Sequence, residues 1–191
     1  MKLAKGTPWL WAAAGLVLAA PQVWADDAPT APFVTTVDKI SAGDTAWMLA
    51  STALVLMMTI PGLALFYAGM VRKKNVIATA LQSFTITCLV TVLWVVVGYS
   101  MAFTPGTPWL GGFSRLLLNG MVFDKAQGMI SVSHVAPTIP ESVLVMFQMT
   151  FAIITPALIA GAFAERMRFG AMVAFMALWS VLVYAPVAHW V

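Results

Sequence analysis

Long apolar segments alternate with short polar ones along most of the chain. The apolar runs cover about residues 46–71, 76–103, 142–164 and 169–191. An α-helix rises about 1.5 Å per residue, so each run is long enough to cross the roughly 30 Å hydrocarbon core of a bilayer. The runs are too long for the strands of a membrane barrel. The pattern therefore predicts an all-α integral membrane protein with four transmembrane helices.

The first 45 residues follow a different pattern. Two lysines precede a short apolar run, Leu10–Ala20, and a small-residue cleavage signal ends at Ala25. This order is typical of a secretory signal peptide over residues 1–25, because the apolar run is too short to span a bilayer. An uncleaved N-terminal anchor is the alternative. We expect cleavage, followed by a polar extracytoplasmic tail over residues 26–45.

The connections between the predicted spans differ in charge. Two short ones, Arg72–Asn75 and Glu165–Arg168, are basic, whereas the long segment 104–141 holds few charges. Because Lys and Arg are enriched in cytoplasmic loops, we expect both basic loops inside the cell and the long segment outside. This orientation agrees with the signal peptide. Within the long segment, residues 114–122 are apolar and are interpreted either as a short interfacial helix or as a loop packed over the outer mouth.

Composition narrows the class of protein further. Hydrophobic residues make up 61% of the chain and charged residues 9%, compared with roughly 45–50% and about 25% in soluble domains. These values exclude a soluble globular domain, a disordered chain and a nucleic-acid-binding domain. Cys88 is the single cysteine, so an intrachain disulfide is impossible, and we expect it to be a buried apolar residue.

Charged side chains are missing from the middle of the predicted spans. Each Asp, Glu, Lys and Arg lies at the end of a span, in a connection or in the N-terminal region. Ionisable groups inside spans mark proton relays and ion-coupled transport, so we expect no ion pump or membrane protease here. No metal-ligand cluster, catalytic triad or phosphate loop is present in the sequence. The sequence predicts neither an enzyme nor a cofactor, and His189 is interpreted as an interfacial residue.

Aromatic and aliphatic side chains form two stripes, each on one helix face. Residues three, four and eleven positions apart return to nearly the same side of a helix. The stripes are Leu63, Phe66 and Tyr67 in the first span, and Phe147, Phe151 and Leu158 in the third. Ordinary helix packing explains such spacing, as it explains small residues like Gly161. The Tyr67 hydroxyl needs a hydrogen-bond partner in lipid, which favours a functional role for its stripe.

Longer motifs are similar to those of a known family. The segment STALVLMMTIPGLALFYAG (51–69) resembles the first helix of the Amt/Mep/Rh ammonium transporter family. FQMTFAIITPA (147–157) and AERMRF (164–169) resemble its third helix and the loop after it, and YAPVAHW (184–190) resembles the end of its fourth. The similarity covers residues 45–191 and points to the bacterial Amt branch.

The resemblance implies a fold of eleven transmembrane helices in two inverted halves, assembled as a homotrimer in the bacterial inner membrane. It implies ammonium as the substrate, recruited as the cation at an outer aromatic site and passed through a hydrophobic pore. A soluble P-II nitrogen-signalling protein is the implied partner at the cytoplasmic face. By the same resemblance the outer site and gate fall on Phe147 and Phe151, and the pore wall on Leu63, Phe66, Tyr67 and Leu158.

The sequence also departs from the family pattern. The paired pore histidines, the outer-site tryptophan, the carboxylate that supports the cation site, the second gate phenylalanine and the cytoplasmic tail have no counterpart in these 191 residues. Trp190 lies near the position of that tryptophan but not at it. We therefore expect an N-terminal part of a longer protein that does not transport by itself. The alternative is a four-span regulatory or degenerate membrane subunit that conducts nothing.

Overall fold

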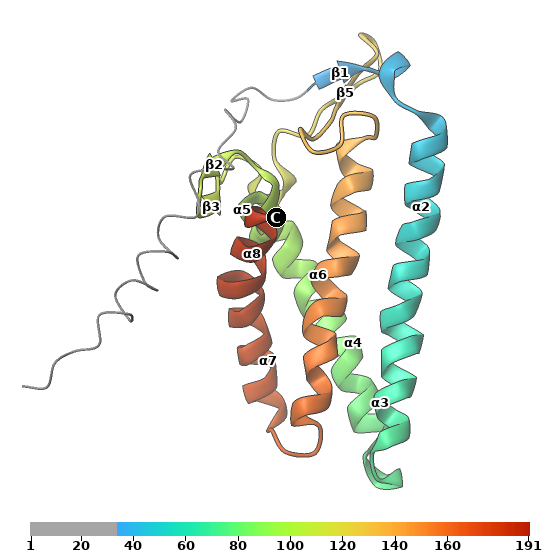
Figure 1. Ribbon diagram of the computed structural model, residues 1–191, viewed down its shortest axis with the longest axis vertical. Helices are drawn as coiled ribbons and strands as arrows, with labels where there is room; N and C mark the ends of the chain where they lie inside the picture. The colour runs from blue at the N-terminus through green and yellow to red at the C-terminus, as the bar shows by residue number, and fades with distance from the viewer. Residues whose placement is uncertain (1–33) are drawn as a thin grey trace, which may run out of the picture.

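The four long helices of the structure run side by side in alternating directions (Figure 1). The structure, a computed structural model, describes residues 34–191. The helices extend over Ala42–Met70, Lys73–Phe103, Glu141–Phe163 and Phe169–Trp190, and each is long and apolar enough to cross a membrane. The prediction of four transmembrane helices is confirmed. The predicted signal peptide and the first part of the predicted tail lie outside the described residues.

Three of the four spans contain a π-helical turn near the middle or toward one end. The first span consists of α2 (Ala42–Met57), a π turn (Met58–Leu63) and α3 (Ala64–Met70). The second consists of a 3₁₀ turn (Lys73–Asn75), α4 (Val76–Leu93), a π turn (Trp94–Gly98) and α5 (Tyr99–Phe103). The fourth consists of α7 (Phe169–Trp179), a π turn (Ser180–Tyr184) and α8 (Ala185–Trp190).

The prolines inside the spans account for part of this irregularity. A proline has no N–H to donate and its ring crowds the preceding turn, and a widened turn accommodates both effects. Pro61 lies within the π turn of the first span, and Pro186 follows the π turn of the fourth. The third span, α6 (Glu141–Phe163), stays a continuous α-helix although it contains Pro156.

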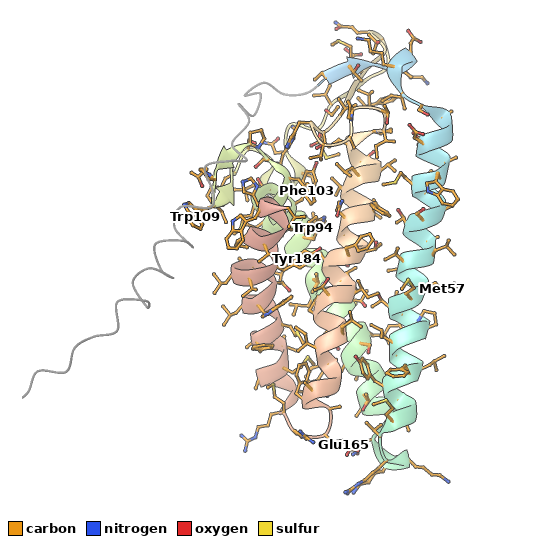
Figure 2. All side chains as sticks on the ribbon, in the orientation of Figure 1. Met57, Trp94, Phe103, Trp109, Glu165 and Tyr184 are labelled. Atoms are coloured by element: carbon orange, nitrogen blue, oxygen red, sulfur yellow. The ribbon has the colours of Figure 1, made fainter. Side chains whose placement is uncertain are left out.

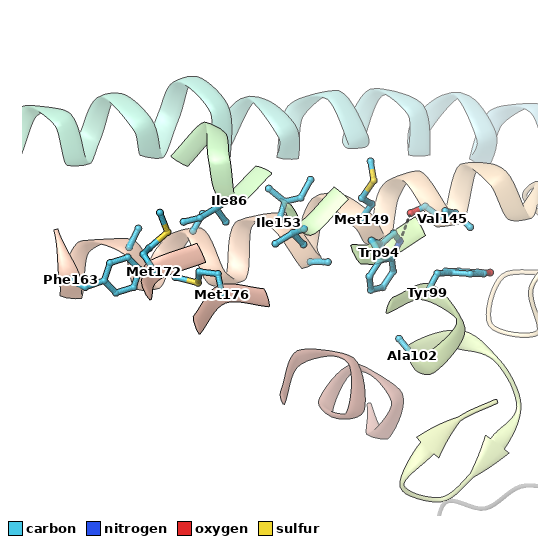
Figure 3. Close-up of a cluster of buried hydrophobic side chains, with 14 residues drawn as sticks. Ile86, Trp94, Tyr99, Ala102, Val145, Met149, Ile153, Phe163, Met172 and Met176 are labelled. Atoms are coloured by element: carbon cyan, nitrogen blue, oxygen red, sulfur yellow. Dashed lines mark hydrogen bonds between the residues drawn. The ribbon is translucent and has the colours of Figure 1, made fainter. Parts of the chain in front are cut away.

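The third span lies at the centre of the packing. Of its most apolar stretch 56% is buried, compared with 44% for the second span, 22% for the fourth and 11% for the first. Its alanines Ala152, Ala157 and Ala160 are almost fully buried, which lets neighbouring backbones approach closely. The core that results joins α4, α6 and α7 (Figure 3) and includes Ile86, Val90, Trp94, Met149, Ile153, Met172 and Met176.

One prediction about this core is wrong. Cys88 is exposed on the surface of the second span rather than buried. Its neighbours two positions away, Ile86 and Val90, both face the core. A step of two residues rotates about 200° around a helix, so Cys88 lies on the opposite side.

Residues 104–140 form short strands and turns at one end of the bundle, which we call the loop end. β1 (Val34–Thr36) pairs with β5 (Met129–Ser131), and β5 pairs with β4 (Phe123–Asp124), all antiparallel. β2 (Gly106–Thr107) and β3 (Leu110–Gly111) form a separate hairpin. A 3₁₀ turn at Leu116–Leu118 is the helical part of this segment. Of the two alternatives for residues 114–122, the structure therefore has a loop.

A buried ion pair fastens this segment to the helices. The Arg115 Nε and Nη2 atoms each donate to one oxygen of the Glu141 carboxylate at 3.0 Å, and the Tyr99 hydroxyl donates to the same carboxylate at 3.0 Å. The Glu141 side chain is only 4% exposed. A buried charge is tolerated when it is paired and hydrogen-bonded, as here. The cluster ties the long connection to the second and third spans.

Both basic loops lie at the opposite end of the bundle, which we call the basic end. The Glu165 carboxylate accepts a hydrogen bond from Asn75 Nδ2 at 2.7 Å and another from the Arg72 backbone N–H at 3.2 Å. These two bonds, the Asn75 bond first, hold the pKa of Glu165 below its usual value. Glu165 also adopts a left-handed backbone conformation, with φ at 62°. Glu165, which lies at the basic end of the bundle (Figure 2), therefore joins the first and third connections.

Candidate functional site: an aromatic wall along the third span

The first level of the site is a pair of phenylalanines on α6. The Phe147 and Phe151 ring centroids are 5.0 Å apart at an interplanar angle of 72°, an edge-to-face arrangement. The two residues are four positions apart, so they lie one above the other on the same side of the helix. Phe147 is half-buried and Phe151 is 38% exposed. The structure thus brings together the two residues assigned to the outer site and leaves part of the Phe151 ring uncovered.

The second level joins the first span to the third. The Tyr67 hydroxyl donates a hydrogen bond to the backbone carbonyl oxygen of Leu158 at 2.8 Å. This is the partner that the Tyr67 hydroxyl was expected to need. The ring itself lies over Gly161, where an added Cβ would stand 2.6 Å from Tyr67 Cε1. Glycine at this position is therefore what allows the tyrosine to lie against the helix.

Of the remaining candidate residues, some pack against the core and others are exposed. Phe66 contacts Tyr67 edge-to-face with centroids 5.3 Å apart, and it is 59% exposed. Leu158 is 55% exposed, whereas Leu63 packs half-buried against the core. The spacing placed Leu63, Phe66 and Tyr67 on one face. In the structure Leu63 and Tyr67 lie toward the core, and Phe66 is rotated away from it.

The two levels lie in line along α6. Phe151 and Leu158 are seven positions apart, which corresponds to about 10 Å along a helix axis. The phenylalanine pair is nearer the loop end, because α6 begins there at Glu141, and the Tyr67–Leu158 pair is nearer the basic end. Between them the Thr155 hydroxyl donates to the Phe151 carbonyl at 2.7 Å within its own helix.

The chemistry available at these levels is that of aromatic faces and aliphatic walls. A cation over an aromatic ring gains about 0.5–2 kcal/mol, which offsets part of its lost hydration. An apolar wall raises the energy of any ion that enters it, and this opposes the passage of hydrated ions. No group of His, Cys, Asp or Glu side chains able to hold a metal ion occurs among residues 34–191.

Sequence reasoning missed several long-range partners. The Leu158 carbonyl, the Arg115–Glu141–Tyr99 cluster and the Glu165–Asn75 contact join segments far apart along the chain. Gly161 was interpreted as an ordinary small packing residue, although its lack of a side chain is what admits Tyr67. The one available signal was that the Tyr67 hydroxyl needs a hydrogen-bond partner in lipid. That signal did not identify which residue supplies the acceptor.

Four apolar helices of membrane length, without charged side chains in their middle, define a multi-pass membrane protein. Residues 46–191 match the Ammonium Transporter Family, and the chain belongs to that family. The resemblance drawn from the sequence motifs is thereby confirmed. The family consists of transporters rather than enzymes.

Individual relatives agree with this assignment. An ammonium transporter of Bacillus subtilis (strain 168) is 52% identical over 149 residues, which are 78% of this chain and 35% of that protein. An ammonium transporter of Aquifex aeolicus (strain VF5) is 44% identical over 153 residues, 80% of this chain and 34% of that protein. The chain thus spans about a third of the length of the curated relatives it matches.

Solved structures give the same fold. The crystal structure of Candida albicans Mep2 superposes with a TM-score of 0.68 at 31% identity, covering 80% of this chain and 32% of that one. The crystal structure of Saccharomyces cerevisiae Mep2 gives a TM-score of 0.67 at 26% identity, with the same coverage. The four helices therefore correspond to the first part of the family fold, as expected.

Proposed function

We propose that residues 46–191 form the first part of the wall of an ammonium- or ammonia-conducting pore. Membership of the Ammonium Transporter Family and the names of the relatives support this function. The observation that carries the proposal is the hydrogen bond from Tyr67 to Leu158, 2.8 Å long. It joins the first span to the third at a level nearer the basic end than the phenylalanine pair, so that candidate residues of both spans meet there.

Each candidate residue has a role in this proposal. Phe147 and Phe151 recruit ammonium as the cation over their ring faces, and Phe151 is also the gate. The exposed part of the Phe151 ring supports this role, since a fully packed ring has no free face for a ligand. The hydrophobic passage toward the basic end is lined by Leu63, Phe66, Tyr67 and Leu158.

The proposal includes an orientation and an assembly. The protein lies in the bacterial inner membrane, with its signal peptide removed and its basic end in the cytoplasm. The Glu165 contacts, which hold both basic loops at one end, support this orientation. The full-length protein is a homotrimer, and a P-II signalling protein docks at the cytoplasmic face.

Residues 1–191 by themselves are proposed not to transport. They span about a third of the length of the relatives, so they supply only part of a pore wall. Expression of these residues alone in cells that lack their own ammonium transporters is expected to give no uptake above background. Uptake by residues 1–191 alone would contradict this part of the proposal.

The recruitment role is tested in the natural full-length protein with a matched pair of variants. Phe151→Ala removes a ring of the proposed site, and we expect the half-saturating ammonium concentration to rise about 2- to 30-fold, the equivalent of about 0.5–2 kcal/mol. Phe175→Ala is the control, because Phe175 is similarly exposed and also pairs with another ring, that of Phe163, on a different part of the bundle. Equal effects of the two substitutions would argue against a binding role for Phe151.

A further inference from the structure

His189 connects three segments at the loop end of the bundle. It lies on α8, and its Nδ1 atom is 3.0 Å from the carbonyl oxygen of Ala102 on α5. Its Nε2 atom is 3.0 Å from the carbonyl oxygen of Thr107 in the β2–β3 hairpin. Both ring nitrogens thus face a backbone carbonyl oxygen, one from the second span and one from the hairpin.

The chemistry of this contact depends on the charge of the ring. A carbonyl oxygen only accepts hydrogen bonds. A neutral imidazole has one N–H, so it donates to one of the two carbonyls and presents a lone pair to the other. An imidazolium has an N–H on each nitrogen and satisfies both. The geometry at Ala102 and Thr107 therefore matches the protonated ring.

A second link beside His189 does not depend on protonation. The Trp190 Nε1 atom donates to the Trp109 carbonyl oxygen at 2.9 Å, and the two indole rings meet edge-to-face with centroids 6.0 Å apart. The hairpin is therefore attached to α8 by consecutive residues. The Trp190 hydrogen bond should not change with pH. It can therefore be compared with the His189 contacts, which depend on protonation.

The surroundings of His189 hold few titratable groups. Within the described residues, α8 packs against α5, the π turn before it and β3. Of these, α5 carries Tyr99, which is bonded to Glu141, the π turn carries Tyr184, and β3 has no titratable side chain.

The other histidine of the chain, His134, interacts electrostatically with His189. Burial, and then the charge of His189, lower the pKa of His134.

We propose that His189 is a positioning residue which, as an imidazolium, clamps the β2–β3 hairpin and the end of the second span to the fourth span. Loss of the proton removes one of its two hydrogen bonds and loosens the hairpin. The clamp would make the loop end of the protein sensitive to pH. It does not depend on the proposed pore function, because it rests on contacts at Ala102 and Thr107 alone.

The charge of the ring is measured directly by NMR of the natural full-length protein in lipid nanodiscs. With ¹⁵N-labelled histidine, an imidazolium gives two protonated ring-nitrogen signals, whereas a neutral ring gives one protonated and one bare nitrogen. At the acidic end of the range between about pH 5 and 8, we expect two protonated nitrogens for His189. A bare nitrogen on His189 at that end would overturn the proposal, and this test needs no variant to fold.

Amide hydrogen exchange of residues 104–112 tests the clamp. After correction for the intrinsic effect of pH, exchange in the unchanged protein is expected to rise about tenfold from about pH 5 to 8, as a charge-assisted hydrogen bond is lost. His189→Gln should raise exchange at low pH and abolish the pH step. Trp190→Phe should raise exchange at every pH and keep the step.

His134→Gln completes the set of variants. Because the charges of His134 and His189 influence each other, His134 is the alternative source of any pH step at the loop end. The step is expected to survive His134→Gln. A step that survives His189→Gln, or that disappears in His134→Gln, would overturn the assignment to His189.

Discussion

The Tyr67 ring packs so closely against the Gly161 backbone that no side chain fits between them. A Cβ at position 161 would lie 2.6 Å from Tyr67 Cε1 and 3.2 Å from two further ring atoms. The ring cannot retreat without breaking its hydroxyl hydrogen bond to Leu158. The attachment of the first span to the third at this level therefore depends on a glycine.

Gly161→Ala is expected to displace Tyr67 and to destabilise the protein by about 1–3 kcal/mol, the usual cost of overpacking. Thermal unfolding of the full-length protein in detergent measures the change. Gly69→Ala is the control, because a Cβ there meets no atom within 4 Å. If both alanines lower the unfolding temperature equally, the close contact with Tyr67 is not the reason why position 161 needs a glycine.

Tyr67→Phe removes the hydrogen bond but keeps the ring. The loss should be smaller than for Gly161→Ala, about 0.5–1.5 kcal/mol, because the ring still packs against the glycine. The same unfolding measurement tests the order of the two variants. A larger effect for Tyr67→Phe than for Gly161→Ala would show that the hydroxyl, rather than the fit of the ring, holds the first span.

The Glu165 contacts predict a dependence of stability on pH. Since the pKa of Glu165 is lowered in the folded protein, its contribution is present above the unfolded pKa and is lost as the pH falls through the folded value. Asn75→Ala removes the largest cause of the lowered pKa and should weaken this acid-induced loss. Unfolding temperatures across the acidic range measure it.

A matched carboxylate serves as the control for that measurement. Glu165→Gln should flatten the acid-range slope, and Asp38→Asn, which changes an exposed acid outside the spans, is the comparison for the loss of one carboxylate. An unchanged slope in Glu165→Gln would show that other groups cause the loss of stability in acid.

The Arg115–Glu141 pair is expected to behave as one unit. Arg115→Gln and Glu141→Gln each leave a buried charge without its partner and should cost about 3–5 kcal/mol. The double substitution should cost clearly less than the sum, as a double-mutant cycle in unfolding would measure. Glu141→Gln should have the larger single effect, because Tyr99 also donates to that carboxylate. Additive costs would mean that the ion pair contributes no coupling.

The local sequence pattern was sufficient to predict the helices but not the contacts between them. The apolar runs predicted the four spans, because bilayer thickness fixes the length of an apolar helix. Spacing also placed Phe147 above Phe151, because a turn of helix is a local property. The side of the helix on which Cys88 lies could not be read from its neighbours, since apolar residues occur on every side of that run.

The hydrogen-bond partners of the polar side chains could be identified only from the structure. Tyr67 bonds to a backbone carbonyl, which every residue possesses, so no side-chain pattern marks Leu158 as the acceptor. The two nitrogens of His189 likewise face carbonyl oxygens, and nothing in the sequence distinguishes Ala102 or Thr107 from their neighbours. The aromatic stripes were visible as spacing, whereas the rotation of Phe66 away from the core depends on how the first span packs.

The attachments of the first span also set an order of events during synthesis. Tyr67 and its acceptor are 91 residues apart, and Asn75 and Glu165 are 90 apart. At about 5–20 residues per second, the ribosome needs roughly 5–18 seconds to supply those partners after the first span has emerged. Through that interval the first span lies in the bilayer with the Tyr67 hydroxyl lacking its native acceptor. Both attachments then become available almost together, as the end of the third span is made.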